Sequence, residues 1–188
     1  MLIVIEGIDG TGKGTQMDLL KKRFPSAVFV KYPTEKFDIL TRYLEKKIEI
    51  SKKALFLTFL ADIEDDQKRI RRLLDEGKLV IMDRYVLSTI AYELGEVGHE
   101  RAKKIVSELE LIRPDKIILL DIEIDEAMKR KANQKTPDRY EEDKKHLSKV
   151  REKFLSLMKE RFLSTIWHKI DANKTIEEVH SEIVSLIK

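Results

Sequence analysis

A glycine-rich segment near the start of the chain carries the strongest chemical signal in the sequence. Residues 7–15 read Gly-Ile-Asp-Gly-Thr-Gly-Lys-Gly-Thr, which contains the pattern glycine, four residues, glycine, lysine. Glycines at these positions let backbone N–H groups turn toward phosphate oxygens, where side chains would block the approach. A helix that begins at such a loop adds its positive end, and Lys13 can reach the β- and γ-phosphates of a nucleotide. We therefore predict a phosphate-binding loop for a nucleoside triphosphate; the alternative is a glycine-rich turn without a ligand.

The residue after the lysine departs from the commonest form of this loop. Gly14 stands where a Ser or Thr hydroxyl usually binds Mg²⁺, and Thr15 follows as the candidate for that role. The metal can instead be held through water. The run from Gly12 to Gln16 resembles the loop of adenylate-kinase-type monophosphate kinases. The loop residues predicted to bind the triphosphate are Gly7, Asp9, Gly10, Thr11, Gly12, Lys13, Gly14 and Thr15.

A second group of side chains that could bind metal or phosphate follows the apolar run Leu79–Met82. Asp83, Arg84 and Tyr85 come directly after it, at the predicted carboxyl end of a strand. Ligands bind at that end of the strands in open α/β sheets. The Asp83 carboxylate can order Mg²⁺ directly or through water, and the Arg84 guanidinium can make paired hydrogen bonds to phosphate. The alternative is that Asp83 caps a helix and Arg84 lies on the surface.

The elements that would position these groups alternate along the chain. Short apolar runs are separated by longer stretches with helical spacing, which favours a parallel sheet with crossover helices. The predicted strands are Leu2–Ile5, Ala27–Val30, Leu79–Met82, Lys116–Leu120 and a fifth that ends at Ile170. Four helices are predicted: one from the glycine-rich loop to about Arg23, one from roughly Lys52 to Asp75, one from about Tyr140 to Leu163, and one from Thr175 to Ile187. The last would begin with a capping box formed by Thr175 and Glu178. We expect a three-layer α/β/α fold around a five-stranded parallel sheet, in a single domain over residues 1–188.

Composition excludes several classes of function. The 188 residues contain no cysteine, so disulfides and thiolate chemistry play no part. The net charge is only +3, from 37 basic and 34 acidic residues, which disfavours a duplex nucleic-acid binder. No apolar run approaches the roughly 18–20 residues that span a bilayer, so we expect no membrane partner. The apolar start, Met1 to Ile5, is too short for a signal peptide, and we expect a cytoplasmic protein.

A longer pattern around Arg84 points to a family. The run Asp83-Arg84-Tyr85-x-x-Ser88-x-x-Ala91-Tyr92 resembles the signature of thymidylate kinases, and the similarity extends from the first strand to residues 170–172. The resemblance implies transfer of a phosphoryl group from ATP to dTMP, with Mg²⁺, in a homodimer. It also implies that Arg84 contacts the acceptor phosphate and that Ser88 and Tyr92 lie at the acceptor. Tyr92 would pack against the sugar, and Asp9 would bind its 3′-hydroxyl.

A basic segment over residues 129–141 is the predicted lid. It contains Lys129, Arg130, Lys131, Lys135 and Arg139. A solvated basic loop is the alternative, but phosphoryl transfer needs cations that cover the transferred group, and the phosphate loop has no arginine. The run Asp138-Arg139-Tyr140-Glu141 resembles the end of the thymidylate kinase lid. The resemblance makes Arg139 catalytic beside Lys13 and Arg84, places Arg130 and Arg139 at ATP, and places Tyr140 at the acceptor nucleoside.

The base-binding positions depart from the family pattern. Phe59 matches the family residue that stacks on thymine, with plain core packing as the alternative, but the family's arginine four residues later is Ile63 here. We therefore expect base recognition to differ, and a monophosphate kinase with another or broader pyrimidine acceptor is an alternative. For the acceptor phosphate, Lys36 is the nearest basic residue after Tyr32-Pro33, with Arg42 as a second candidate.

A nucleotide-dependent switch of the GTPase type is a further alternative. Such switches read guanine with Asn-Lys-x-Asp, and residues 173–176 here read Asn-Lys-Thr-Ile. This fingerprint therefore fails, and the kinase interpretation is the leading one.

Overall fold

The protein is built on one five-stranded parallel sheet. The structure is a computed structural model that describes residues 1–93, 95–132 and 144–187, with residues 131 and 132 described by their backbone alone. The strands are β1 (Leu2–Glu6), β2 (Val28–Lys31), β3 (Val80–Asp83), β4 (Lys116–Asp121) and β5 (Trp167–Asp171). Their order across the sheet is β2-β3-β1-β4-β5, and all four neighbouring pairs run parallel. The predicted sheet is therefore confirmed.

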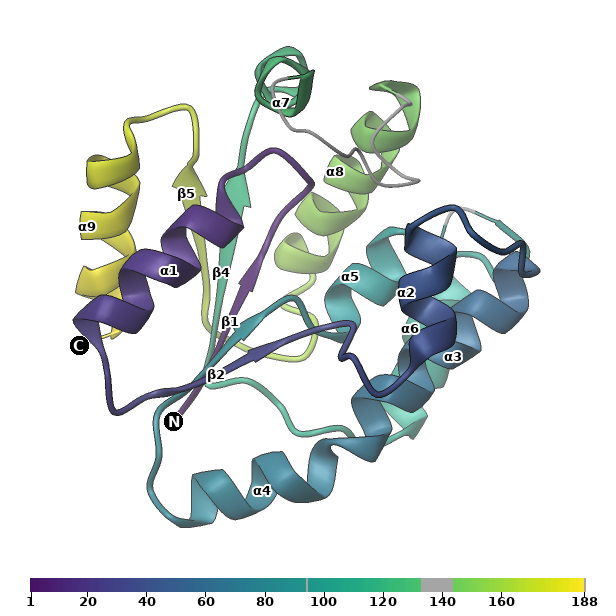
Figure 1. Cartoon of the computed structure of the whole chain (residues 1–188), viewed down its shortest axis with the longest axis horizontal. Helices are drawn as coiled ribbons and strands as arrows, with labels where there is room; N and C mark the ends of the chain where they lie inside the picture. The colour runs from purple at the N-terminus through teal and green to yellow at the C-terminus, as the bar shows by residue number, and fades with distance from the viewer. Residues whose placement is uncertain (94, 133–143, 188) are drawn as a thin grey trace.

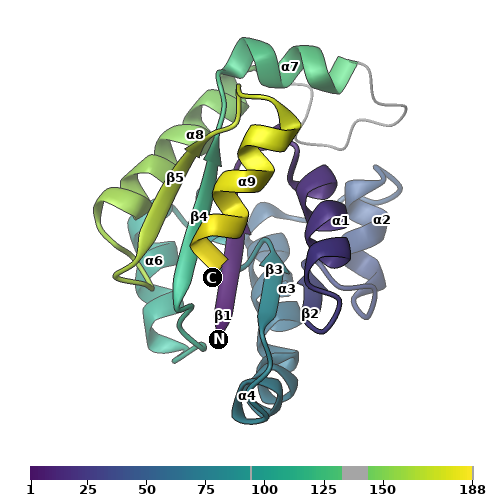
Figure 2. The same cartoon turned by 90° about the vertical axis from the view of Figure 1, so that its left-hand side faces the viewer.

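Helices cover both faces of this sheet, as Figures 1 and 2 show. The helices are α1 (Lys13–Arg23), α2 (Asp38–Leu44), α3 (Lys52–Asp65), α4 (Gln67–Asp75), α5 (Val86–Ala91), α6 (His99–Glu108), α7 (Ile124–Ala132), α8 (Lys144–Lys159) and α9 (Ile176–Ile187). Helices α1 and α9 lie together on one face, whereas α5, α6 and α8 pack on the other. This arrangement is the predicted three-layer α/β/α fold.

The three inner strands are apolar because both of their faces are covered. Residues 2–5 of β1 and residues 80–82 of β3 are at most 1% exposed, and β4 is buried after its first residue. Strands buried on both faces are expected to be continuously hydrophobic rather than alternating. The outer strands β2 and β5 are only partly buried, which explains why their sequence signal is weaker.

Two helix predictions differ from the structure. The predicted single helix from Lys52 to Asp75 is two helices, because the chain turns at Asp66 between α3 and α4. The Asp66 side chain accepts hydrogen bonds from Arg69 and from the Tyr32 hydroxyl, which fix this junction against the loop after β2. Helix α8 ends at Lys159 rather than near Leu163, where residues 161 and 163 have left-handed φ angles of 52° and 63°. The predicted start of that helix, at Tyr140, lies outside the described residues.

The last helix begins with the predicted capping box. The Thr175 hydroxyl accepts from the Glu178 N–H at 3.2 Å, and Glu178 accepts from the Thr175 N–H at 2.9 Å. These reciprocal bonds satisfy two backbone donors that a helix start otherwise leaves open. In the described part of the chain, no helix has the length and apolar character needed to cross a membrane.

Candidate active site

The groups singled out in the sequence meet at the carboxyl edge of the sheet. The glycine-rich loop connects β1 to α1, and Asp83 to Tyr85 connect β3 to α5. Strands β1 and β3 are neighbours in which Ile5 pairs with Asp83, so the two connections emerge side by side. Parallel strands bring such loops together at one edge, where α/β proteins bind ligands.

Two glycines of the loop are required by close packing. Gly7 has a φ of 149°, and a Cβ atom there would lie 2.5 Å from the backbone oxygen of Leu120 on β4. Gly10 has a φ of 86°, and its Cβ would lie 2.7 Å from the backbone oxygen of Ala127 on α7. Any side chain at either position would strain the backbone and displace a neighbouring element. The loop therefore depends on glycine for its shape as well as for access to phosphate.

Lys13 lies buried at the centre of this loop. Its ammonium donates to the backbone oxygens of Gly7 at 2.8 Å and Ile8 at 2.9 Å, and to the Thr11 hydroxyl at 3.3 Å. Burial, together with the nearby charge of Arg84, lowers the pKa of Lys13 to about 8. A desolvated ammonium aimed into a ring of backbone groups is suited to bind an incoming phosphate.

Arg84 joins the glycine-rich loop to helix α5. Its guanidinium pairs with the Asp9 carboxylate, and it donates to the Ser88 hydroxyl at 3.0 Å and to the Gly7 backbone oxygen at 3.4 Å. It also lies over the Tyr92 ring, 5.4 Å from the ring centre. Burial acts to lower the pKa of Arg84, but the nearby charges, of which Asp9 is the strongest, together outweigh it, and the pKa lies well above its usual value.

Asp9 is held from two sides. One carboxylate oxygen pairs with Arg84, and the other accepts a hydrogen bond from the Tyr92 hydroxyl at 3.0 Å. The family resemblance implies a separate acceptor contact for Asp9, Arg84 and Tyr92, and the structure brings all three together. Asp9 therefore connects the phosphate loop with the start and the end of α5.

Asp83 offers an unused acceptor at the same edge of the sheet. Its Oδ1 atom is buried and has no hydrogen-bond partner among the described residues. Such an atom fits Mg²⁺ or a water bound to it, because Mg²⁺ prefers oxygen ligands and is often bound through one or two carboxylates. Thr15, the other metal candidate, is exposed on the first turn of α1. The described residues contain no group of three or more acidic or histidine side chains that could hold a metal alone.

A cavity beside Arg84 joins polar and apolar side chains. Its polar wall includes Asp9, Arg84, Ser88 and Tyr92, all of which the sequence predicted. The apolar wall includes Phe59 and Ile63, together with Leu55 and Phe56 from the same helix, α3. Further lining residues were not predicted from the sequence: Tyr43, Leu44, Lys52, Thr89, Glu93 and His146. Most lie outside the recognised motifs, and Thr89 occupies an unspecified position within the Asp83–Tyr92 run. A flat apolar ring that carries a charged group would match this combination of walls.

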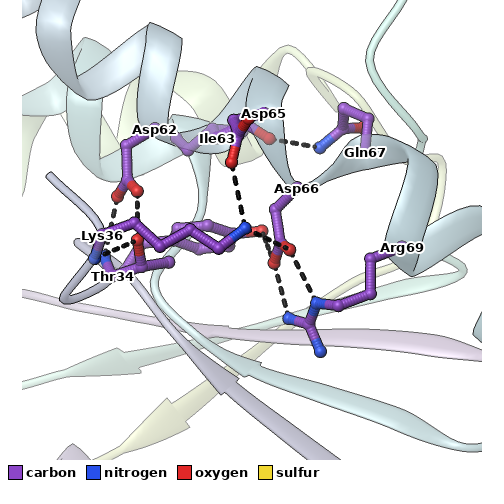
Figure 3. Close-up of polar contacts among 9 residues, drawn as sticks. Thr34, Lys36, Asp62, Ile63, Asp65, Asp66, Gln67 and Arg69 are labelled. Atoms are coloured by element: carbon purple, nitrogen blue, oxygen red, sulfur yellow. Dashed lines mark hydrogen bonds and ion pairs between the residues drawn. The ribbon is translucent and has the colours of Figure 1, made fainter.

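The two basic residues predicted to bind the acceptor phosphate, Lys36 and Arg42, lie outside this cavity. Lys36 is exposed, pairs with Asp65 at 3.0 Å and is 3.9 Å from Asp66, as Figure 3 shows. The loop that carries Lys36 is fastened by Thr34, whose N–H and hydroxyl both donate to Asp62. Arg42 is also exposed and lies 3.7 Å from Asp38. Neither Lys36 nor Arg42 lines the cavity.

The predicted lid is described only in part. Arg130 donates to Glu126 at 3.1 Å and to the backbone oxygen of Ala172 at 3.0 Å, so it is tied to the loop after β5. The structure gives no account of Arg139 and Tyr140, because residues 133–143 lie outside the described ranges.

A carboxylate at the end of β1 was missed by the sequence analysis. Glu6 is fully buried and accepts hydrogen bonds from the backbone N–H groups of Tyr85 and Ser88 and from the Ser88 hydroxyl. The signal that could have revealed it is an acidic residue that follows four apolar ones and directly precedes Gly7. Burial raises the pKa of Glu6 to about 7, even though these hydrogen bonds and the charge of Arg84 lower it.

Comparison with known proteins agrees with this geometry. The family model described as thymidylate kinase matches residues 5–183. The chain belongs to the thymidylate kinase family. It is therefore an enzyme of the nucleoside monophosphate kinase class, built on the P-loop fold, and the family uses ATP as its phosphate donor. This result favours the kinase interpretation over the nucleotide-dependent switch.

Individual relatives match over nearly their whole length. Probable thymidylate kinases of Thermococcus onnurineus and Methanocaldococcus jannaschii are each 37% identical over the whole chain, which covers 97% and 96% of those proteins. A thymidylate kinase of Helicobacter pylori is 32% identical over the whole chain and 98% of its own length. A solved thymidylate kinase of Candida albicans, described as having broad substrate specificity, superimposes with a TM-score of 0.79. It is 26% identical over 99% of this chain and 90% of its own.

Proposed function

We propose that the protein transfers the γ-phosphoryl group of ATP to the 5′-phosphate of dTMP, giving ADP and dTDP. The observation that carries this proposal is the position of Arg84, which contacts the phosphate loop at Gly7 and also lines the adjoining cavity. An arginine between the two binding regions can contact both the donated and the accepting phosphate groups. Family membership supports ATP as the donor and dTMP as the acceptor.

The donor side is assigned to the glycine-rich loop. Lys13 would exchange its contacts with loop oxygens for the β- and γ-phosphates of ATP, while backbone N–H groups of residues 7–15 bind the remaining oxygens. Arg130 and Arg139 are proposed to cover ATP from the lid, with Arg139 nearest the transferred group. Asp83 and Thr15 would hold Mg²⁺, which when bound neutralises charge on the phosphates.

The acceptor side is assigned to the cavity. Phe59 would stack on the base, Asp9 would accept from the 3′-hydroxyl, and Tyr92 would pack against the sugar. Ser88 and Tyr140 complete the proposed acceptor contacts, and Lys36 would contact the acceptor phosphate after leaving Asp65. An oxygen of that phosphate forms the new bond to the γ-phosphorus as the bond to the β-phosphate oxygen breaks. Catalysis then rests on positioning and charge neutralisation by Lys13, Arg84 and Arg139.

A broader pyrimidine acceptor is the second candidate, because Ile63 forms part of the apolar cavity wall. Ile63 is 1% exposed and has no polar atom in its side chain. It can pack against the base but cannot donate a hydrogen bond to its edge. Selectivity among thymine, uracil and cytosine therefore depends on the other lining residues.

The deciding experiment is ADP release from Mg²⁺-ATP with dTMP, dUMP, UMP, CMP, AMP or GMP as acceptor, beside a blank without acceptor. A clear preference for dTMP would support the proposed function. Similar rates with several pyrimidines would favour the broader kinase. Release equal to the blank with every acceptor would contradict both proposals and return the nucleotide-dependent switch to consideration.

We further propose that the protein acts as a homodimer on these small nucleotides and has no nucleic-acid partner. The family resemblance supports the dimer, and the near balance of 37 basic and 34 acidic residues supports the second point.

A further inference from the structure

Glu6 is a buried carboxylate to which the proposed reaction gives no role. It is the last residue of β1, and its side chain is 0% exposed. Taking a carboxylate out of water costs several kcal/mol unless hydrogen bonds or opposite charges compensate. The groups that compensate it therefore indicate what the side chain does.

Every hydrogen bond that the structure shows to this carboxylate comes from the segment after β3. Oε1 accepts from the Tyr85 N–H at 2.8 Å and from the Ser88 N–H at 3.3 Å, and Oε2 accepts from the Ser88 hydroxyl at 2.7 Å. Tyr85 is the N-cap residue of α5, and its own side chain makes no capping bond. Glu6 thus caps this helix from a neighbouring strand, in place of the Ser, Thr, Asp or Asn side chain usual at that position.

The hydrogen bond from the Tyr85 N–H to Glu6 also constrains Arg84, the residue directly before Tyr85. Arg84 has a φ of 69°, a left-handed conformation that arginine rarely adopts, and the Glu6–Tyr85 bond fixes the backbone immediately after it. The Ser88 hydroxyl gives its only proton to Glu6, which leaves its lone pairs for the Arg84 guanidinium at 3.0 Å. A directed chain of hydrogen bonds therefore runs from Arg84 through Ser88 to Glu6.

We propose that Glu6 is a positioning residue, which aims the Arg84 guanidinium between the donor and acceptor sites through Ser88 and the backbone at Tyr85. This inference rests on the proposed function, because it concerns the same transfer reaction. It assigns to β1 a role in catalysis that does not require contact with either nucleotide.

The first test is Glu6→Gln, which keeps the shape of the side chain. The amide can still accept from a backbone N–H through its oxygen, but its nitrogen cannot accept the Ser88 proton, so the chain of hydrogen bonds is broken. Because displacement of a catalytic group by about 1 Å can cost roughly 100-fold in rate, we expect kcat to fall by about 10- to 100-fold. The KM for ATP should change by less than about threefold, because Lys13 and the loop are untouched. Assays run near pH 8, where the wild-type carboxylate is ionised, since burial raises its pKa to about 7.

The second test separates positioning from a general loss of structure. In an Arg84→Ala background, Glu6→Gln should lower kcat no further, because the side chain that it aims is already gone. A matched control is Asp115→Asn, which alters the carboxylate that accepts from the Leu2 N–H at the opposite end of β1. We expect this control to lower the melting temperature and to leave kcat within about twofold of wild type.

The kcat values of Glu6→Gln in the wild-type and Arg84→Ala backgrounds either support or overturn the positioning role of Glu6. Loss of kcat with Glu6→Gln that disappears in the Arg84→Ala background supports it. Unchanged kcat, or the same fold-loss in both backgrounds, overturns it. If Glu6→Gln does not fold, Glu6→Asp draws the carboxylate back from Ser88 and is judged by the same two comparisons. A wild-type protein that phosphorylates no acceptor overturns the proposed function and this inference together, whereas an active wild type with undiminished Glu6→Gln overturns this inference alone.

Discussion

Arg84 combines an unfavourable backbone conformation with contacts to four other residues of the candidate site. Its φ of 69° lies in the left-handed region, which costs a residue with a Cβ atom about 1–2 kcal/mol. The guanidinium meets Asp9, Ser88, Gly7 and the Tyr92 ring from this position. Strain of this kind persists where the surrounding structure enforces it, and it is concentrated at functional sites.

Two substitutions separate the strain from the chemistry of Arg84. We expect Arg84→Ala and Arg84→Gly to lose turnover equally, by about 100- to 1,000-fold, because both remove the same charge. Glycine relieves the strained φ, so the glycine variant should be the more stable by about 1 kcal/mol, or roughly 2–4 °C in melting temperature. Steady-state kinetics and thermal denaturation measure the two effects. Near-normal turnover in either variant would remove Arg84 from the mechanism, and equal melting temperatures would show that residue 84 is unstrained.

Lys13 predicts a pH dependence of ATP binding. Burial lowers its pKa to about 8, so the nucleotide-free protein loses this positive charge as the pH rises through that value. Bound triphosphate favours the charged ammonium, so binding above pH 8 must take up a proton and the affinity for ATP should fall. Below pH 8 the lysine is already charged, and its contribution to affinity should be constant.

Calorimetry of ATP binding at about pH 7 and about pH 9, in buffers of different ionisation enthalpy, measures this proton uptake. Lys13→Met should bind more weakly and take up no proton at the higher pH. The exposed-lysine variant Lys104→Met should behave like wild type. Equal proton uptake by Lys13→Met and wild type would show that another group titrates.

At the scale of elements, the predictable parts are those in which one local pattern decides the structure. The strands were found within about a residue or two because the sheet is covered on both faces and its inner strands are continuously apolar. The glycine-rich loop was found because its shape requires glycine at 7 and 10. The capping box at Thr175 was found because it is a contact between residues three apart.

Three features that were missed involve contacts between distant residues. The break at Asp66 is held by hydrogen bonds from Arg69, three residues later, and from Tyr32, 34 residues earlier, and the helical pattern of the sequence continues through it. Glu6 bonds to residues 79 and 82 positions later, so its role was hidden in an apparently simple strand. The position of Lys36 against Asp65 also depends on a partner 29 residues away.

The capping box gives a stability prediction separate from activity. Thr175→Ala should cost about 1 kcal/mol, which lowers the melting temperature by roughly 2–4 °C, while kcat stays unchanged. The control is Thr165→Ala, an exposed threonine outside the helices, which should change stability by less than about 0.5 kcal/mol. Equal effects of the two substitutions in thermal denaturation would show that the cap contributes nothing.

The junction between α3 and α4 predicts a response to acid. The hydrogen bonds from Arg69 (Figure 3), and then the Tyr32 hydroxyl and the charge of Lys36, hold the pKa of Asp66 below its usual value. A lowered carboxyl pKa gives stability that is present above the unfolded-state pKa and lost as the pH falls through the folded-state value. Asp66→Asn should therefore be less stable than wild type at neutral pH, and the difference should shrink at about pH 3.

Urea denaturation at both pH values measures the Asp66 contribution. The exposed carboxylate Asp75 provides the control, and Asp75→Asn should match wild type within about 0.5 kcal/mol at either pH. A difference between Asp66→Asn and wild type that is as large in acid as at neutral pH would contradict the role of the ionised carboxylate.

At the scale of the whole molecule, the order of the strands places the two halves of the site together. Strand β1 lies between β3 and β4, so the phosphate loop that follows β1 is flanked by the loops after both neighbours. The β3 side supplies Asp83 and Arg84, and the β4 side packs on Gly7 through Leu120. Strand order was not part of the sequence prediction, because the apolar pattern of a strand does not determine which strands pair with it.

The proposed homodimer predicts a mass of twice the 22.0 kDa of one chain. Sedimentation velocity over a range of protein concentrations measures it directly. Members of one family commonly keep their mode of association, and closed two-fold pairs are the commonest oligomers. A single 22.0 kDa species at all concentrations would contradict the dimer and would leave the proposed reaction untouched.

Helix α1, which begins at the phosphate loop, lies beside helix α9 on the same face of the sheet (Figure 2). The Gln16 side chain donates to the backbone oxygen of Ile176 at 2.9 Å, across 160 residues of sequence. Ribosomes add about 5–20 residues per second, so the helix that packs beside α1 emerges roughly 8–30 seconds after α1 itself. During synthesis the helix that begins at the phosphate loop is therefore made early and gains its contacts with α9 late. Nascent chains stalled before α9 should remain open to proteases at α1, whereas chains released after it should be protected.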